Sequence, residues 1–351
     1  MATRTSKRVT NRPARSKPAP NAAQVALQPR LALALAQASV AAYQDFERQP
    51  IVPPADYKVM ARWTGWDSAW PFNGTEERYG LLFQSTLPGA WKTFIFAFRG
   101  TDSDMDAYED AWFDTTAFAP TSGKVSPTPY VASGFYSVYD TKGGAMKASM
   151  RQQLFALIAQ HKPRRIYITG HSLGGALCQL FALDVAVSRP ALWAATQNFA
   201  SPMVGTDAWH SAYEAQAAQK DPERRTIRVY NYMDWVPTLP PALFNYRHVG
   251  AGFRTDFDVI GAHYPHLLSR HSILNLQTVL SHAVWATPQV WTGTFQDASD
   301  PANQMQSRVP PAGADVPWAD RLAAYMRQER DERASVAIHR SAKRDARAVS
   351  S

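Results

Sequence analysis

The sequence predicts an α/β domain built on a mainly parallel sheet with helices on both faces. Short β-rich runs alternate with longer helical patterns, and the intervening helices are long enough to be crossover connections. Sheets of this kind are covered on both faces. Of the 351 residues, 45% are hydrophobic, which is enough for a large core and rules out a disordered or fibrous chain.

The predicted elements follow one another in a regular order. The apolar stretch Leu31–Tyr43 continues into YQDFER and predicts the first helix, although it superficially resembles the apolar region of a secretion signal. A second apolar helical pattern begins at His271. Between them, the sequence predicts strands at Tyr79–Gln84, Thr93–Phe98, Arg165–Thr169, Thr196–Ala200 and Thr226–Tyr230, and helices at Ala145–His161 and Gly175–Val187.

Polar segments flank this domain on both sides. Residues 1–28 contain prolines and bases with little apolar content, which predicts a flexible basic tail. From residue 292 the chain turns polar and loop-like, and a charged helical segment follows. We therefore expect a tail at 1–28, one domain at 29–291 and a C-terminal extension at 292–351.

The charge distribution gives little support for a nucleic-acid partner. Lys and Arg number 37 against 29 Asp and Glu, but seven of the bases precede the first acid, Asp45. Removing these seven leaves 30 bases against 29 acids, so the pI near 9.5 is mostly a property of the tail. No apolar run reaches the roughly 18 to 20 residues of a transmembrane helix. We expect a cytoplasmic location, because no signal peptide is recognisable, without excluding secretion.

The segment that follows the third predicted strand carries the clearest chemical signal. Its sequence is GHSLGGAL, in which Ser172 occupies the centre of a G-x-S-x-G pattern between a β-rich run and a helical pattern. A tight turn in this context holds a serine in a strained conformation at the edge of the sheet, and the new helix points its free N–H groups towards developing negative charge. The alternative is that Ser172 is an ordinary helix N-cap.

The sequence contains four notable motifs: FAFRGT from Phe96, GHSLGGAL from Gly170, FASPMVG from Phe199 and NYMDWVPTLPP from Asn231. Together they resemble the class 3 lipases, the fungal-type triacylglycerol lipase branch of the α/β-hydrolases, and they occur in the order found in the family. The resemblance spans roughly Leu31 to Leu280 and implies an α/β-hydrolase fold and a Ser-His-Asp triad. The long basic N-terminus, the C-terminal extension and the lack of paired cysteines depart from the family.

A serine hydroxyl needs a histidine to accept its proton and a carboxylate to orient that histidine. Asp234 follows a predicted strand and precedes a Pro-rich loop, where the resemblance also implies the catalytic acid. His271 begins the last apolar helix and is the preferred base, with His266 and His263 as alternatives. These three histidines lack an acidic or cysteine partner at metal-ligand spacing, so neither a metal nor another cofactor is expected.

The oxyanion of acyl transfer needs N–H donors. We expect these from Leu173, directly after the serine, and from Thr101, after the strand that ends in FRGT. The following residues repeat apolar side chains at helical spacing, with acids on the other face. This pattern predicts either a lid over the site or a plain surface helix; the apolar residues are Met105, Tyr108 and Trp112.

These residues predict a serine carboxylester hydrolase, and the resemblance implies a lipase acting on acylglycerols, with possible transient contact with a lipid interface. A phospholipase, another esterase or a catalytically silent binding protein on the same fold are the alternatives. The acyl-chain preference cannot be deduced, because the binding groove is formed by residues scattered along the chain.

Overall fold

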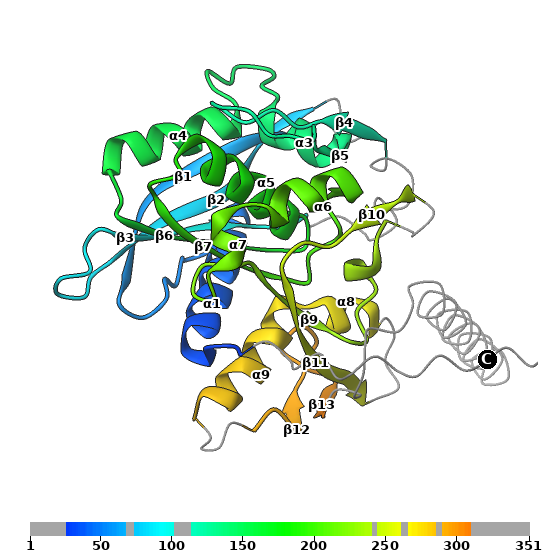
Figure 1. Cartoon of the computed structure of the whole chain (residues 1–351). Helices are drawn as coiled ribbons and strands as arrows, with labels where there is room; N and C mark the ends of the chain where they lie inside the picture. The colour runs from blue at the N-terminus through cyan, green and yellow to red at the C-terminus, as the bar shows by residue number, and fades with distance from the viewer. Residues whose placement is uncertain are drawn as a thin grey trace, which may run out of the picture.

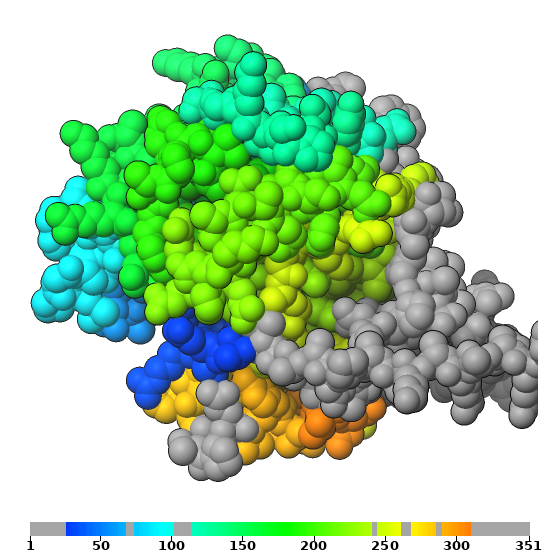
Figure 2. Space-filling model, viewed as in Figure 1, coloured from blue at the N-terminus to red at the C-terminus, as the bar shows by residue number. Residues whose placement is uncertain are grey.

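The computed structural model describes residues 26–67, 74–101, 114–240, 244–260, 266–285 and 290–309. Helices lie on both faces of a large twisted sheet (Figure 1). In the space-filling view, the blue surface of the first helix adjoins the yellow and orange C-terminal elements, below the green helices of the middle of the chain (Figure 2). The arrangement confirms the predicted α/β class and its two helical layers.

Nine of the described strands form the main sheet, in the order β1-β2-β3-β6-β7-β9-β11-β13-β12. The five central strands from β3 to β11 run parallel, and the two strands added at each edge are antiparallel to their neighbours. The carboxyl ends of the parallel strands therefore meet at one edge. The strands are β1 Tyr57–Asp67, β2 Thr75–Ser85, β3 Thr93–Phe98, β6 Arg165–His171, β7 Trp193–Phe199, β9 Ile227–Asn231, β11 Ala251–Ile260, β12 Gly293–Gln296 and β13 Gln304–Arg308.

One face of the sheet is covered by helices α3, α4 and α5, with α6 and α7 beyond them. Helix α5 is apolar on nearly all sides because it is buried between the sheet and its neighbours. A capping box of Ser149 and Gln152 begins α4. The helices are α3 Ser133–Asp140, α4 Met150–His161, α5 Leu173–Ser188, α6 Asp207–Glu214 and α7 Ala217–Lys220.

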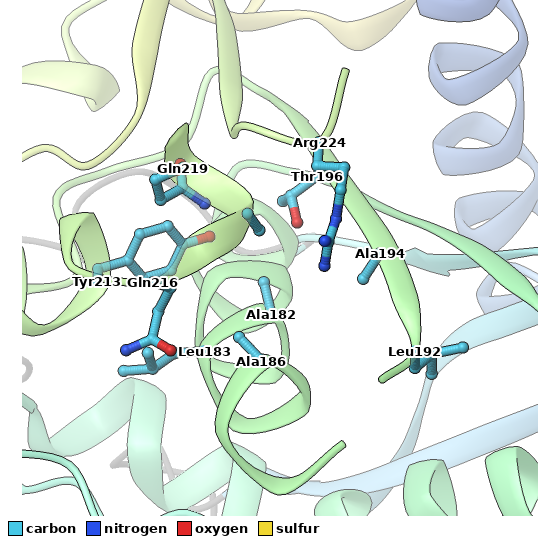
Figure 3. Close-up of a pocket in the computed structure, with 11 residues that line it drawn as sticks. Ala182, Leu183, Ala186, Leu192, Ala194, Thr196, Tyr213, Gln216, Gln219 and Arg224 are labelled. Carbon is cyan, nitrogen blue, oxygen red and sulfur yellow. The ribbon is translucent and has the colours of Figure 1, made fainter. Parts of the chain in front are cut away.

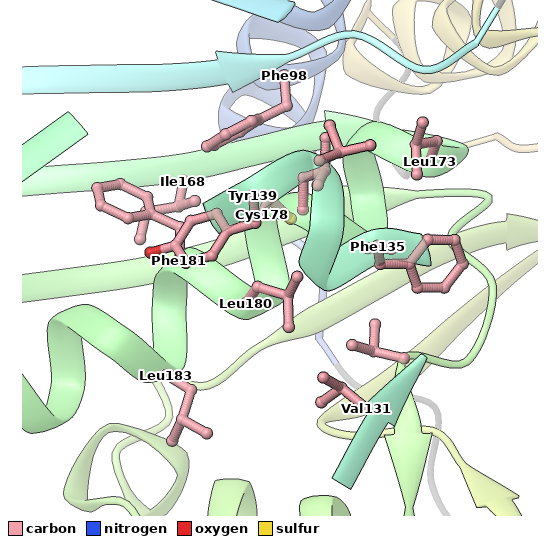
Figure 4. Close-up of a cluster of buried hydrophobic side chains, with 14 of the residues drawn as sticks. Phe98, Val131, Phe135, Tyr139, Ile168, Leu173, Cys178, Leu180, Phe181 and Leu183 are labelled. Atoms are coloured by element: carbon pink, nitrogen blue, oxygen red, sulfur yellow. The ribbon is translucent and has the colours of Figure 1, made fainter. Parts of the chain in front are cut away.

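The core beneath these helices is rich in aromatic rings. Phe98 of β3 and Phe181 of α5 have ring centroids 6.0 Å apart, and Ile168 and Leu180 lie in the same cluster (Figure 4). Burial of each large apolar side chain contributes on the order of 1.5–3 kcal/mol. This packing holds α5 against the sheet.

The opposite face is covered by α1 (Pro29–Phe46) and α9 (Ile273–Trp285), which pack on each other and on the sheet. The short helix α8 (His266–His271) precedes α9 and contacts β11. A 3₁₀ turn, η1, spans Val236–Thr238. A second sheet has four short strands in the order β10-β8-β5-β4: β10 Tyr246–Arg247, β8 Gly205–Thr206, β5 Tyr130–Ala132 and β4 Thr115–Ala117.

The five predicted strands and the predicted helices all appear, with ends that differ by a few residues. Of the main sheet, β1 and β11 are not among the predicted strands. The sequence predicts a loop from residue 292, whereas β12 and β13 extend the main sheet there, because β13 pairs with β11. Of the expected tail at 1–28, the structure describes only residues 26–28, where Leu27 is buried in the core that α1 covers; the charged C-terminal helix lies outside the described residues.

Candidate active site

Ser172 lies in the sharp turn between β6 and α5. Its backbone has φ 58° and ψ −128°, a conformation that is unfavourable for any residue with a side chain. The N–H of Ser172 donates to the carbonyl of Phe199 in the neighbouring strand, and its own carbonyl accepts from Gly175, 2.8 Å away. The turn is therefore held from both sides, at the carboxyl edge of the sheet.

Glycines surround the serine because neighbouring backbone leaves no room for a side chain. A Cβ at Gly170 would lie 2.2 Å from the carbonyl oxygen of Gly174. At Gly174 it would lie 2.4 Å from the carbonyl oxygen of Arg99, at the end of β3. The G-x-S-x-G spacing thus reflects close contact within the turn and between the turn and β3.

Asp234 lies just beyond the end of β9, and its side chain is buried. Its Oδ1 accepts a hydrogen bond from the N–H of Val236 at 3.0 Å. Its Oδ2 lies 2.7 Å from Nδ1 of His271. Each carboxylate oxygen therefore has a separate partner, which fixes the plane of the carboxylate.

His271 is the last residue of α8, and its ring packs against the end of β6. The rings of His271 and His171, the residue directly before the serine, have centroids 4.6 Å apart. Because a carboxylate only accepts hydrogen bonds, Nδ1 of His271 carries the proton in this pair. The other ring nitrogen, Nε2, is buried and has no hydrogen-bond partner within the described part of the chain. In the neutral ring, Nε2 is the basic atom.

His171 has a different environment. Its Nε2 lies 2.7 Å from the backbone carbonyl oxygen of His271, and its Nδ1 lies 2.8 Å from the hydroxyl of Tyr43. Burial, together with the neighbouring His271 ring, holds the pKa of His171 well below its usual range. The ring is therefore neutral, and both of its nitrogens are engaged.

The expected oxyanion donors lie on two sides of Ser172. Leu173 is the first residue of α5, where a helix leaves its N–H without an intrahelical partner. On the other side, a Cβ at Gly100 would lie 2.8 Å from Cβ of Ser172, so the chain before Thr101 passes directly beside the serine. The buried Arg99 donates from Nη1 to the carbonyl oxygen of Gly100 at 2.6 Å.

The structure brings Asp234 and His271 into contact, and it places the ring of His271 against that of His171, the residue directly before Ser172. Of the two alternative bases, His263 lies outside the described residues, and His266 begins α8 without a described side chain. Met105, Tyr108 and Trp112 also lie outside the described residues. Tyr43 was not predicted, because it reaches the site from α1 without a local motif. Arg99 lies in the FRGT motif, but the motif does not show which group its guanidinium binds.

The pocket in Figure 3 lies away from this site. It is formed between α5, β7 and the α6–α7 segment, with Thr196, Tyr213 and Gln219 among its lining residues. Its volume of about 20 Å³ has room for a single water molecule. We therefore exclude it as a substrate site. Among the described helices, none has the length and apolar character needed to cross a bilayer.

Comparisons with known proteins point to one family for the middle of the chain. Residues 95–244 match the model of the family described as Lipase (class 3). A phospholipase A1-II 3 from Oryza sativa subsp. indica is 33% identical over 187 residues, and a lipase from Rhizomucor miehei is 32% identical over 164 residues. These alignments cover 47% and 45% of this chain, but only 42% and 40% of the two relatives.

Solved structures support the fold. The nonglycosylated LIP2 lipase of Yarrowia lipolytica superimposes with a TM-score of 0.51 at 19% identity, covering 66% of this chain and 82% of that chain. At this level of identity, the likeness concerns the fold alone, which is the α/β-hydrolase fold.

Proposed function

Through residues 95–244 this chain belongs to the class 3 lipase family of the α/β-hydrolase superfamily, and on that premise we propose that it is a serine carboxylester hydrolase. In this proposal Ser172 is the nucleophile, His271 is the general base and Asp234 orients the histidine. The backbone N–H groups of Leu173 and Thr101 stabilise the tetrahedral oxyanion. The proposed substrate is an acylglycerol.

The proposed reaction has two half-reactions. Nε2 of His271 accepts the proton of Ser172 as Oγ attacks the ester carbonyl, and the imidazolium then protonates the leaving alcohol. An acyl-serine ester remains. Water attacks it with His271 again as the base, which releases the fatty acid and restores the serine hydroxyl. Asp234 stays ionised and stabilises the imidazolium in both halves.

The observation that carries the proposal is the 2.7 Å contact between Asp234 and His271. The contact leaves Nε2 of His271 as the basic nitrogen, on a ring whose centroid lies 4.6 Å from that of His171, the residue directly before the strained Ser172. Packing alone would not require two buried polar residues from distant parts of the chain to meet at the carboxyl edge of the sheet.

The experiment compares fatty-acid release from a triacylglycerol emulsion by the wild-type protein and by Ser172→Ala. We expect release by the wild type and a loss of at least about 10³-fold in the variant. Equal activity of the two proteins would show that Ser172 is not the nucleophile. If both are inactive, labelling with a fluorophosphonate distinguishes a different ester substrate from a catalytically silent binding protein, which would not react.

A phospholipid is the second candidate substrate, because a relative named phospholipase A1-II 3 matches this chain as well as the Rhizomucor lipase does. The discriminating measurement compares the rates on triacylglycerol and on diacylphosphatidylcholine of equal chain length. A phosphatidylcholine rate that exceeds the triacylglycerol rate would overturn the acylglycerol assignment while leaving the esterase assignment intact.

Transient contact with a lipid interface is part of the same proposal. It predicts a steep rise in rate when a short-chain triacylglycerol passes its solubility limit. The control is a fully soluble ester at the same concentrations, for which the rate should rise smoothly. Identical profiles for the two esters would remove interfacial contact from the proposal.

A further inference from the structure

The last three backbone carbonyls of α8 each accept a hydrogen bond from a side chain of a different element. The carbonyl of Ser269 accepts from Nδ2 of Asn275 in α9 at 2.9 Å. That of Arg270 accepts from Nδ2 of Asn231 in β9 at 3.0 Å. The carbonyl of His271 itself lies 2.7 Å from Nε2 of His171 in β6. A helix leaves its final carbonyls without intrahelical partners, and side chains are one of the groups that can satisfy them.

Hydrogen-bond chemistry fixes the direction of each contact. A carbonyl oxygen only accepts, so Nε2 of His171 carries a proton and its neutral Nδ1 accepts from the hydroxyl of Tyr43. Asn231 uses its Oδ1 to accept from the N–H of Phe257, so its Nδ2 faces the carbonyl of Arg270. These assignments follow from the backbone groups and involve no choice of tautomer or amide flip.

Asn275 is oriented in the same way. Its Oδ1 accepts from the N–H of Ala298, and its Nδ2 also donates to Oδ1 of Asp297 at 2.8 Å. Asp297 and Ala298 belong to the turn between β12 and β13, which lies beyond the matched family segment. The hairpin that extends the sheet therefore also supports the end of α8.

We infer that His171, Asn231 and Asn275 form a carbonyl clamp that positions the backbone of His271 for catalysis. The inference rests on the proposed role of His271 as the base. The bond to Asp234 fixes the direction of the imidazole ring, but it does not fix the backbone that carries the ring. Because misplacement of a catalytic group by about 1 Å can lower the rate about 10²-fold, a rigid backbone at His271 has a direct effect on catalysis.

His171 is the central residue of the clamp. It binds the carbonyl of the base itself, which requires a proton on Nε2, and the hydroxyl of Tyr43 donates to the remaining Nδ1. Burial and the low pKa of His171 keep it from placing a second positive charge beside the imidazolium that forms on His271. All three clamp residues are buried, so water does not readily replace them.

The test compares His171→Phe, which keeps a ring but removes the donor, with His171→Gln, whose amide can still donate to the carbonyl. His210→Phe is the matched control, because the ring of His210 also contacts a backbone carbonyl, that of His248 at 2.7 Å, in another part of the molecule. Each variant is assayed for kcat and KM on a soluble ester. Solvent exchange of the His271 Nδ1 proton is followed by NMR on protein labelled with ¹⁵N-histidine.

In His171→Phe we expect kcat to fall about 10- to 100-fold with KM changed less than about threefold, and the Nδ1 proton to exchange about tenfold faster. His171→Gln should recover most of both losses, and His210→Phe should change neither. Asn275→Leu, which removes a different donor, tests the clamp again if His171→Phe does not fold.

The inference is overturned if His171→Phe or Asn275→Leu folds with unchanged proton exchange. Failure of the proposed function gives a different result. The wild-type protein would then have no esterase activity, but the Nδ1 proton of His271 would still exchange faster in His171→Phe than in the wild type. That outcome would support the clamp and contradict its role in catalysis.

Discussion

Nη1 of Arg99 donates to the carbonyl oxygen of Gly100, 2.6 Å away, and this bond fixes the peptide group that also contains the N–H of Thr101. In a trans peptide the C=O and N–H point in opposite directions. Holding the carbonyl therefore also holds the proposed oxyanion donor. The guanidinium is itself fixed, because it stacks between the rings of Phe46 and Tyr79, 3.6 Å and 4.4 Å from their centroids.

This relationship predicts the effect of Arg99→Met. We expect kcat/KM to fall about 10- to 100-fold, because the donor is no longer held towards the oxyanion. An alkylboronic acid forms a tetrahedral adduct with the serine, and its inhibition constant should rise by a similar factor. Arg62→Met, an exposed arginine, is the control and should change neither value. A fall in kcat/KM with unchanged boronate inhibition would show that Arg99 acts in some other way.

Asp234→Asn should lower kcat by about 10³- to 10⁴-fold with little loss of stability. An amide has nearly the shape of a carboxylate, but it can donate to Nδ1 of His271 and so favour the tautomer in which Nε2 carries the proton. Such a ring cannot accept the proton of Ser172. Steady-state kinetics combined with thermal unfolding would check both parts. Near wild-type kcat in a folded variant would exclude Asp234 from the proposed triad.

Ser172 and the two strands beside it were predictable because the information is local. The runs TFIFAF and IYIT are apolar enough to predict buried strands, and the glycines around Ser172 report the tight turn that follows. Asp234 and His271 lack such a local signature. They were selected by their order in the chain and by the family resemblance, and the sequence left His266 and His263 as alternatives.

The residues that support the site could not be predicted in this way. His171 and His271 are 100 positions apart, and their contact depends on how β6 and α8 meet at the sheet edge. The hairpin β12–β13 was interpreted as loop because its sequences, GTFQ and QMQSR, are mostly polar. The pairing of β13 with β11 stabilises the hairpin, and the local sequence pattern does not reveal this tertiary contact.

Asp184 predicts a stability effect that is separate from catalysis. This fully buried carboxylate of α5 accepts hydrogen bonds from the backbone and hydroxyl of Thr121 and from the hydroxyls of Tyr139 and Ser188. Asp184→Ala leaves the buried hydroxyl of Tyr139 without its acceptor and removes the bonds from Thr121 and Ser188, so we expect the free energy of unfolding to fall by about 3 kcal/mol. Urea denaturation measures this change.

Two comparisons make the Asp184 prediction specific. Glu223→Ala removes an exposed acid and should change the free energy of unfolding by less than about 0.5 kcal/mol. Below its melting temperature, Asp184→Ala should keep kcat/KM within about threefold of the wild type, because the residue does not touch the proposed triad. A variant as stable as the wild type would contradict the assigned hydrogen bonds.

Asp297 predicts how stability depends on pH. Burial by itself would raise the pKa of Asp297, but hydrogen bonds from Ser269, Ser299 and Asn275 outweigh burial and hold the pKa below its usual range. A carboxyl whose pKa is lower in the folded protein stabilises that state above its unfolded pKa, near 3.9. The contribution disappears as the pH falls through the lower, folded pKa.

The wild type and Asp297→Asn should therefore differ most in free energy of unfolding between about pH 5 and 8, and the difference should shrink progressively below about pH 4. Urea denaturation at a series of pH values measures it. Asp300→Asn is the matched control, because Asp300 lies in the same turn. The described hydrogen bonds of its side chain are to Ala302 and Asn303 and stay within that turn. A difference for Asp297→Asn that stays constant from pH 2 to 8 would show that the charge of Asp297 does not stabilise the hairpin against α9.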